Sequence, residues 1–191
     1  MSENILKEKT KFDSFISKAK EKKRLIIYSV SAILVLIIII FYLNDRSQNK
    51  NLLVADEYND AKIMIENKKI SNGAIKLKEI IDKKNKIYSP LALYLLVEND
   101  LIKNEEELIT LFDKVISIKK IDKENINLIK IKKSLILSET GTEVELLDLL
   151  NPIINSDSIW RNNAAKILGD YYSYKGENNK SKSYYELINI K

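Results

Sequence analysis

The sequence contains no cysteine and no histidine among its 191 residues. The absence of cysteine excludes disulfides, thiol nucleophiles and zinc–thiolate sites, although it fits either an oxidising or a reducing compartment. The absence of histidine removes the usual general base at neutral pH and excludes a serine–histidine–acid triad. Only four glycines are present, and they are scattered, so no glycine-rich phosphate loop can be assembled. We therefore expect no enzymatic activity, no cofactor and no small-molecule substrate.

Two clusters of carboxylates are the remaining candidates for acid–base chemistry or metal binding. The acidic run at residues 105–107 is better explained as the start of a helix, where negative side chains complement the helix dipole. Glu143, Glu145 and Asp148 lack the spacing of a calcium-binding loop. The sequence therefore predicts no catalytic residue and no metal site.

Positive charge is concentrated at the N-terminus. Residues 1–24 contain eight Lys or Arg against four Asp or Glu, whereas residues 44–191 contain 24 against 23. The N-terminal tail thus carries +4 of the formal net charge of +5. Because a nucleic-acid-binding protein needs a basic face on its folded part, we expect no nucleic-acid partner.

An apolar run extends from Leu25 to Leu43, 19 residues without a charged side chain. As a helix this run would be roughly 28 Å long, close to the thickness of the hydrocarbon core of a bilayer. A core helix of a globular domain usually keeps one polar face, and this segment has none. We therefore predict a single transmembrane helix at residues 25–43.

The charges on the two sides of this run predict its direction. Eight Lys or Arg precede it, and three follow within the next twenty residues. The positive-inside rule then places residues 1–24 in the cytoplasm and residues 44–191 on the other side of the membrane. A cleaved signal peptide is the alternative, but no Ala-x-Ala site follows Leu43, so an uncleaved anchor is favoured.

The cytoplasmic tail has an apolar stripe of its own. Phe12, Phe15, Ile16 and Ala19 recur at helical spacing, with lysines between them. Phe12, Phe15 and Ile16 are therefore candidates for contact with the membrane surface or with a partner helix on the cytoplasmic face. The alternative is a basic stretch that serves only to orient the anchor.

Residues 44–191 show helical apolar periodicity nearly throughout and no alternating strand pattern, which predicts an all-α domain of about eight helices. Pro90 suits a first helical turn, and Pro152 should kink or end the helix that contains it. The expected breaks between helices fall near Ser71, Ser89-Pro90, Asn104, Asp122, Thr142, Ser156 to Ser158, and Gly176.

Three of these breaks carry N-cap signals. Asn104 can cap a helix while Glu107 reaches back to it as the third-position partner. Ser71 and Thr142 can cap the helices that follow them in the same way.

The last pair of helices has the pattern of a tetratricopeptide unit: Leu168-Gly169, Tyr172, Gly176, Ser181 and Tyr185. Gly169 and Ser181 would let the two helices approach closely, and Gly176 would allow the turn between them. Tyr172 and Tyr185 would fill the space beside them.

Earlier units follow at similar intervals. A step of 35 residues back from Gly176 reaches Gly141, and further steps of 38 and 34 reach Lys103 and Lys69. Apolar residues stand in corresponding core places, but the small residues are missing from these units. A tetratricopeptide-like solenoid is therefore predicted, and a generic antiparallel helical bundle stays open as the alternative.

The order of basic tail, anchor and helical pairs resembles the ancillary subunit of the Sec translocon, the YfgM-like family. This resemblance implies a bacterial inner-membrane protein with a single span, a cytoplasmic N-terminus and a periplasmic domain. The earlier units depart from the family pattern because they are rich in Lys and Ile and lack the expected alanines. The local matches are residues 11–24 with Phe12 and Phe15, Ser89-Pro90-Leu91-Ala92, Trp160, Ala164-Ala165, Leu168-Gly169-Asp170, Gly176 and Tyr184-Tyr185.

Binding of a protein partner is the remaining class of function. In a solenoid the first helix of each pair usually lines the concave surface. Trp160 could be a core residue or a partner anchor, and we favour the core. The candidate partner-binding residues on the last pair are Asn163, Lys166, Asp170, Ser173 and Tyr174.

The expected function is that of a non-enzymatic helper at the translocon, which would contact exported polypeptides or periplasmic chaperones. An anchored scaffold for another envelope assembly, such as cell division or cytochrome maturation, is the alternative. A third possibility, an envelope enzyme that uses only carboxylates, would require a deep cleft of paired acids.

Overall fold

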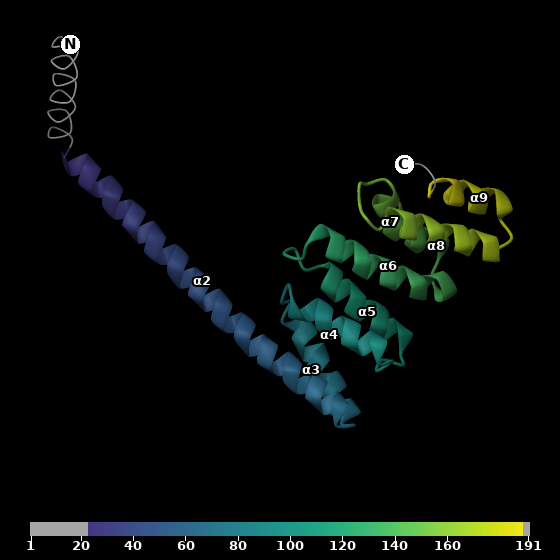
Figure 1. Ribbon diagram of the computed structural model, residues 1–191, viewed down its shortest axis with the longest axis horizontal. Helices are drawn as coiled ribbons and strands as arrows, with labels where there is room; N and C mark the ends of the chain where they lie inside the picture. The colour runs from purple at the N-terminus through teal and green to yellow at the C-terminus, as the bar shows by residue number, and fades with distance from the viewer. Residues whose placement is uncertain (1–22, 189–191) are drawn as a thin grey trace, which may run out of the picture. The chain divides into compact units, whose positions relative to one another are not determined.

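The computed structural model describes residues 23–188, without the side chains of residues 23–26, 41 and 43–50. The tail candidates Phe12, Phe15 and Ile16 lie outside the described residues. Eight helices and no strand occur between residues 23 and 188 (Figure 1), which confirms the all-α prediction for this range. The chain divides into two compact units, Met1–Leu52 and Leu53–Lys191.

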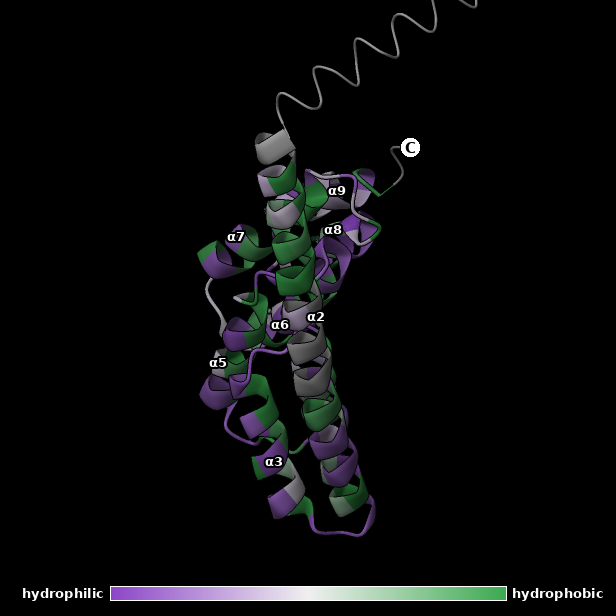
Figure 2. Cartoon of the chain, turned by 90° about the vertical axis from the view of Figure 1, so that its left-hand side faces the viewer, coloured by the Kyte–Doolittle hydropathy of each residue, from purple (hydrophilic) through white to green (hydrophobic). Residues whose placement is uncertain are grey.

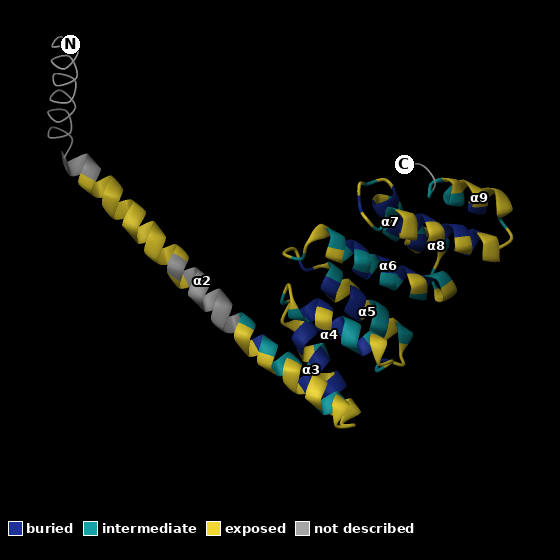
Figure 3. Ribbon diagram, viewed as in Figure 1, coloured by how far each residue is buried: buried dark blue, intermediate teal, exposed yellow. Residues whose placement is uncertain are grey.

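Helix α2 (Lys23–Glu66) is the longest element, with 44 residues, and the unit boundary falls within it. In the first unit every described side chain from Ile27 to Ile40 is exposed (Figure 3). Hydrophobic residues predominate along this part of the helix (Figure 2). Over the residues whose side chains are described, no helix is both long and apolar enough to cross a bilayer. The transmembrane helix at residues 25–43 is thus not supported by these residues and stays a prediction.

The second unit contains the end of α2, from Leu53, and seven further helices. From α3 to α9 each helix packs on its neighbours in the chain, and α3 also contacts α5, as α6 contacts α8. The bounds are α3 (Ile70–Asp82), α4 (Tyr88–Glu98), α5 (Glu105–Ile116), α6 (Lys123–Thr140), α7 (Glu143–Ile154), α8 (Arg161–Tyr174) and α9 (Asn178–Glu186).

The helix starts confirm two of the three predicted caps. Asn104 accepts a hydrogen bond from the Glu107 N–H at 2.7 Å, and Thr142 forms a complete capping box with Glu145. The Glu107 carboxylate does not complete a box at Asn104, because it pairs with Lys78 of α3 instead. The prediction for Ser71 is wrong: α3 begins at Ile70, and no side chain caps it.

The two prolines lie near helix ends. Pro90 is the third residue of α4, in the first turn as predicted, where its missing N–H costs no helical hydrogen bond. Pro152 lies inside α7, and the helix ends two residues later at Ile154. The helix end expected from Pro152 therefore follows within one turn of the proline.

The core of the second unit is formed by two hydrophobic clusters that meet at α6. The first cluster extends from Val54 on α2 to Ile129 on α6, with Phe112 fully buried inside it. The second extends from Ile131 on α6 to Tyr172 on α8. Since Ile129 and Ile131 lie on the same helix, α6 contributes to both clusters.

Helices within a pair approach each other over small residues at both ends of this unit. In the last pair the Ser181 hydroxyl donates to the Gly169 carbonyl at 2.9 Å, and a Cβ at Gly169 would lie 2.7 Å from the Tyr185 ring. Gly176, with φ +74°, makes the turn between α8 and α9, as predicted.

The first pair repeats this arrangement. A Cβ at Gly73 would lie 2.6 Å from the Ile65 side chain and 3.1 Å from the Ala61 carbonyl. Ala61 and Gly73 are twelve residues apart, as are Gly169 and Ser181. The prediction that small residues are missing from the earlier units is therefore wrong for the first pair, where the contact involves Ala61 and Gly73.

We predict that Gly73→Ala destabilises the second unit by about 1 kcal/mol, because overpacking against Ile65 and Ala61 exceeds the gain in helix propensity. Urea unfolding of the full-length protein in detergent, followed by circular dichroism, measures this change. The neighbouring exposed residue provides a control: Asn72→Ala should be neutral or stabilising. A Gly73→Ala protein as stable as Asn72→Ala would contradict the close approach.

Candidate binding groove

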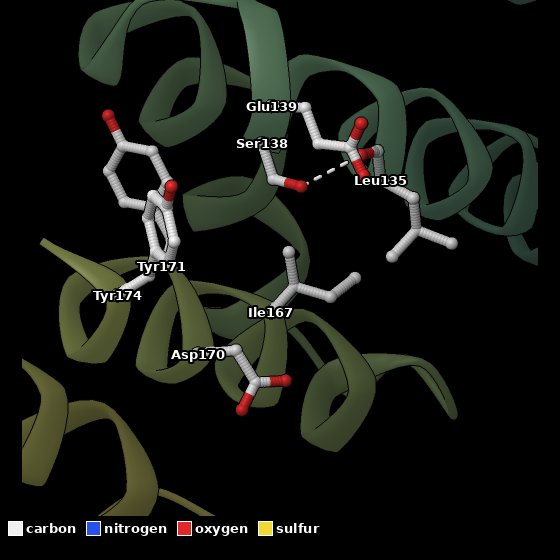
Figure 4. A pocket seen from close by; sticks show the side chains of 7 residues that line it. All are labelled: Leu135, Ser138, Glu139, Ile167, Asp170, Tyr171 and Tyr174. Carbon is white, nitrogen blue, oxygen red and sulfur yellow. Dashed lines mark hydrogen bonds between the residues drawn. The ribbon is translucent and has the colours of Figure 1, made fainter.

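An open groove of about 530 Å³ lies between α6 and α8 in the second unit. In Figure 4 the Leu135 and Ile167 side chains face each other across it, and two tyrosines stand together at one end. One carboxylate comes from each helix, Glu139 from α6 and Asp170 from α8. The lining residues are Leu135, Ser138, Glu139, Ile167, Asp170, Tyr171 and Tyr174.

All five residues proposed from the sequence for partner binding lie on α8 and are exposed. Asp170 and Tyr174 line the groove, whereas Asn163, Lys166 and Ser173 do not. Their role in binding stays a prediction.

The sequence analysis missed Ile167 and Tyr171 on α8 and the whole α6 wall of the groove, although the repeat interval could have located the α6 wall. A step of 35 residues back from Asp170 reaches Leu135, and the same step from Tyr174 reaches Glu139. Both are lining residues. The interval that relates Gly176 to Gly141 therefore also relates the two walls of the groove.

The two carboxylates of the groove differ in their surroundings. Asp170 accepts hydrogen bonds from Lys166 at 2.6 Å and from the Tyr185 hydroxyl at 2.5 Å. Burial raises the pKa of Asp170, but these two donors outweigh it and hold the pKa below its ordinary value. Glu139 is exposed and forms no ion pair or hydrogen bond through its side chain with the described residues. Its carboxylate is therefore available for a new partner.

Tyr171 forms part of the groove wall, yet it is only 6% exposed. The Lys175 ammonium lies 4.5 Å from the centre of its ring, a cation–π contact. Its buried hydroxyl has no partner at hydrogen-bond distance within the described part of the chain, although its interaction with Lys175 raises the pKa of that ammonium. A buried hydroxyl without a partner costs about 1–3 kcal/mol, so a polar group from a ligand could recover this energy.

A polar network joins the start of α6 to the loop before α8. The Ser158 hydroxyl donates to the Glu124 carboxylate at 2.6 Å and accepts from the buried Asn127 amide at 3.0 Å. The Trp160 indole N–H donates to the Glu124 carbonyl at 3.0 Å. Since the groove lies at the opposite ends of α6 and α8, this network fixes the relative position of its two walls.

Trp160 is half-buried and packs against the second hydrophobic cluster. Its ring is therefore part of the domain's packing, in line with the core interpretation that the sequence favoured.

The carboxylate cluster at the start of α7 takes part in packing of the last helices. Glu143 accepts from the Tyr172 hydroxyl at 2.7 Å and from Lys180 of α9 at 3.1 Å. These hydrogen bonds lower the pKa of Glu143, while burial and the same bond raise the pKa of Tyr172. The Tyr172 ring also stacks on Tyr184 of α9, with ring centres 5.5 Å apart. Glu143 thus helps to hold α9 on α7 and α8.

Within the described residues, no group of three or more acidic side chains is arranged to hold a metal ion. No protein-family model matches the sequence, and no curated protein is significantly similar to it. The function must therefore be inferred from the sequence pattern and the geometry.

We predict that Ser158→Ala destabilises the second unit by about 1–3 kcal/mol, because the Asn127 amide and the Glu124 carboxylate each lose a buried partner. The chain contains a single tryptophan, so Trp160 fluorescence reports directly on this network during urea unfolding. Ser173→Ala, at an exposed serine of α8, should change stability by less than about 0.5 kcal/mol. Equal stability of the two variants would show that the network does not hold the loop.

Proposed function

We propose that this protein is a membrane-anchored, non-enzymatic binding protein whose helical domain contacts other polypeptides outside the cytoplasm. The observation that carries the proposal is the apolar stretch of α2, in which every described side chain from Ile27 to Ile40 is exposed. The large apolar side chains from Ile27 to Tyr42 that are described are 44–69% exposed. Exposed apolar surface of this extent is unfavourable in water and favourable in lipid.

The proposed span is residues 25–43, which includes residues beyond those whose side chains are described. The basic tail at residues 1–24 would remain in the cytoplasm, and its charge supports this direction. The second unit would then stand on the periplasmic side of a bacterial inner membrane.

The second unit is proposed to be a tetratricopeptide-like solenoid. Three features support this assignment: packing of consecutive helices, the additional contact of α6 with α8, and the interval of 35 residues between the groove walls. The small-residue contacts in the first and last pairs also favour a repeat over a generic bundle.

The groove between α6 and α8 is the proposed binding surface. Resemblance of the whole architecture to the YfgM-like family favours a place beside the Sec translocon, where the protein would receive exported polypeptides or pass them to periplasmic chaperones. An anchor near the channel would raise the effective concentration of a weakly binding groove. A scaffold for cell division or cytochrome maturation is the alternative, since it would use the same anchor and domain.

Cysteine labelling tests the topology on a clean background, because the natural chain contains no cysteine. In cells with a permeabilised outer membrane, a membrane-impermeant maleimide should label Ser183→Cys, while Ser14→Cys should react only after lysis. Labelling of both positions, or of Ser14→Cys alone, would contradict the proposed direction. The full-length protein should remain in the membrane after carbonate extraction.

Purification of the full-length protein in mild detergent tests the place of action. We expect translocon subunits to copurify with it, because the anchor and the domain would both lie beside the channel. A protein with charges in the span, Ile33→Lys with Ile37→Lys, serves as the control and should lose them, since a charge at the centre of a span costs about 2.5–3.5 kcal/mol. Copurification of division or cytochrome-maturation proteins alone would favour the scaffold.

A further inference from the structure

The groove between α6 and α8 combines apolar and acidic chemistry. Leu135 is 53% exposed and faces Ile167 across the groove (Figure 4), so an apolar side chain placed between them would be removed from water. Glu139 and Asp170 provide carboxylates on opposite walls, and none of the lining side chains is basic. A ligand that matches this surface is apolar in part and positively charged in part.

Glu139 is the carboxylate with the greater capacity for a new partner. Asp170 already accepts from Lys166 and Tyr185, whereas Glu139 forms no such contact with the described residues. Tyr174 also lines the groove, and its 93% exposed ring offers a face for a guanidinium or ammonium group. A cationic side chain that reaches Glu139 would therefore meet an available carboxylate close to the apolar Leu135 (Figure 4).

The buried Tyr171 hydroxyl is an independent observation that points to a ligand, because no partner among the described residues lies at hydrogen-bond distance from it. Its side chain is more than nine-tenths buried in the groove wall, and the hydroxyl has no hydrogen-bond partner within the described part of the chain. Main-chain carbonyl and N–H groups of an extended peptide are the polar groups that such a hydroxyl can pair with. The hydroxyl is itself covered, so the peptide can reach it only when a neighbouring side chain shifts.

We propose that the groove between α6 and α8 binds an extended segment of another polypeptide in which an apolar side chain lies next to a lysine or arginine. The apolar side chain inserts between Leu135 and Ile167. The basic side chain binds the Glu139 carboxylate, and the peptide backbone reaches Tyr171. This inference rests on the proposed function in taking a polypeptide as the partner, and it adds the chemistry of the recognised segment.

Fluorescence anisotropy with the full-length protein in detergent tests this preference. Three labelled peptides of equal length differ only at their centre, which is Leu-Arg, Leu-Glu or Ser-Arg. We expect the Leu-Arg peptide to bind most tightly, and its affinity to fall when salt is raised to ~1 M, since screening weakens the charge pair. Tighter or equal binding of the Leu-Glu peptide would overturn the proposal.

Variants locate the binding site on the groove. Glu139→Gln should weaken binding of the Leu-Arg peptide about threefold without affecting the Leu-Glu peptide. Leu135→Ser should weaken both leucine peptides about tenfold, because it removes one side of the apolar slot. Asp148→Asn and Val144→Ser, exposed positions of α7 outside the groove, are matched controls and should leave binding unchanged.

The controls also separate this inference from the proposed function. If translocon subunits still copurify with Glu139→Gln and Leu135→Ser while no peptide prefers the groove, the inference is wrong and the anchored binding protein stands. Equal weakening by the α7 control variants, or peptide-independent pairing of two copies through the groove, would likewise overturn it.

Discussion

The close contact of paired helices over small side chains determines the form of the second unit. At Gly73 and at Gly169 a single added Cβ would collide with the partner helix. Large side chains fill the space beside these positions: the Tyr185 ring lies against Gly169, and Tyr172 of α8 stacks on Tyr184 of α9. Packing of consecutive helices buries Phe112, Leu150 and Tyr172, so each of these helices depends on its neighbours for its core.

Helix α6 connects the two halves of this stack. Ile129 and Ile131 place it in both hydrophobic clusters, and Glu124 at its start binds the loop that leads into α8. The groove lies at the other end of the same two helices, where the apolar side chains of Leu135 and Ile167 line it. The hydrogen-bonded network at one end of the two helices holds them in place, and the groove at the other end is open. This arrangement suits a binding surface that is preorganised before its ligand binds.

Much of this architecture could be predicted from the sequence. The apolar periodicity predicted the all-α class. Asn104 and Thr142 predicted two helix starts correctly, because N-capping depends only on residues close together in the sequence. The prediction that Ser71 caps a helix was wrong, because a serine within the first turn of a helix has the same local sequence pattern as a serine at the N-cap. Lys78 could not be foreseen as the partner of Glu107, because the two residues lie 29 positions apart and meet only through packing. Of the α8 wall of the groove, the candidates included Asp170 and Tyr174 but neither Ile167 nor Tyr171. The α6 wall required the repeat interval to be applied to Asp170 and Tyr174.

The central claim, an anchored domain that contacts other polypeptides through the face bearing the groove, is tested most directly by photocrosslinking in intact cells. A photoreactive phenylalanine analogue replaces Tyr174 at the groove or Val144 on α7, both of them exposed. The account predicts adducts with translocon subunits or exported polypeptides from position 174 and none from position 144. The same adducts from both positions, or adducts from position 144 alone, would contradict it.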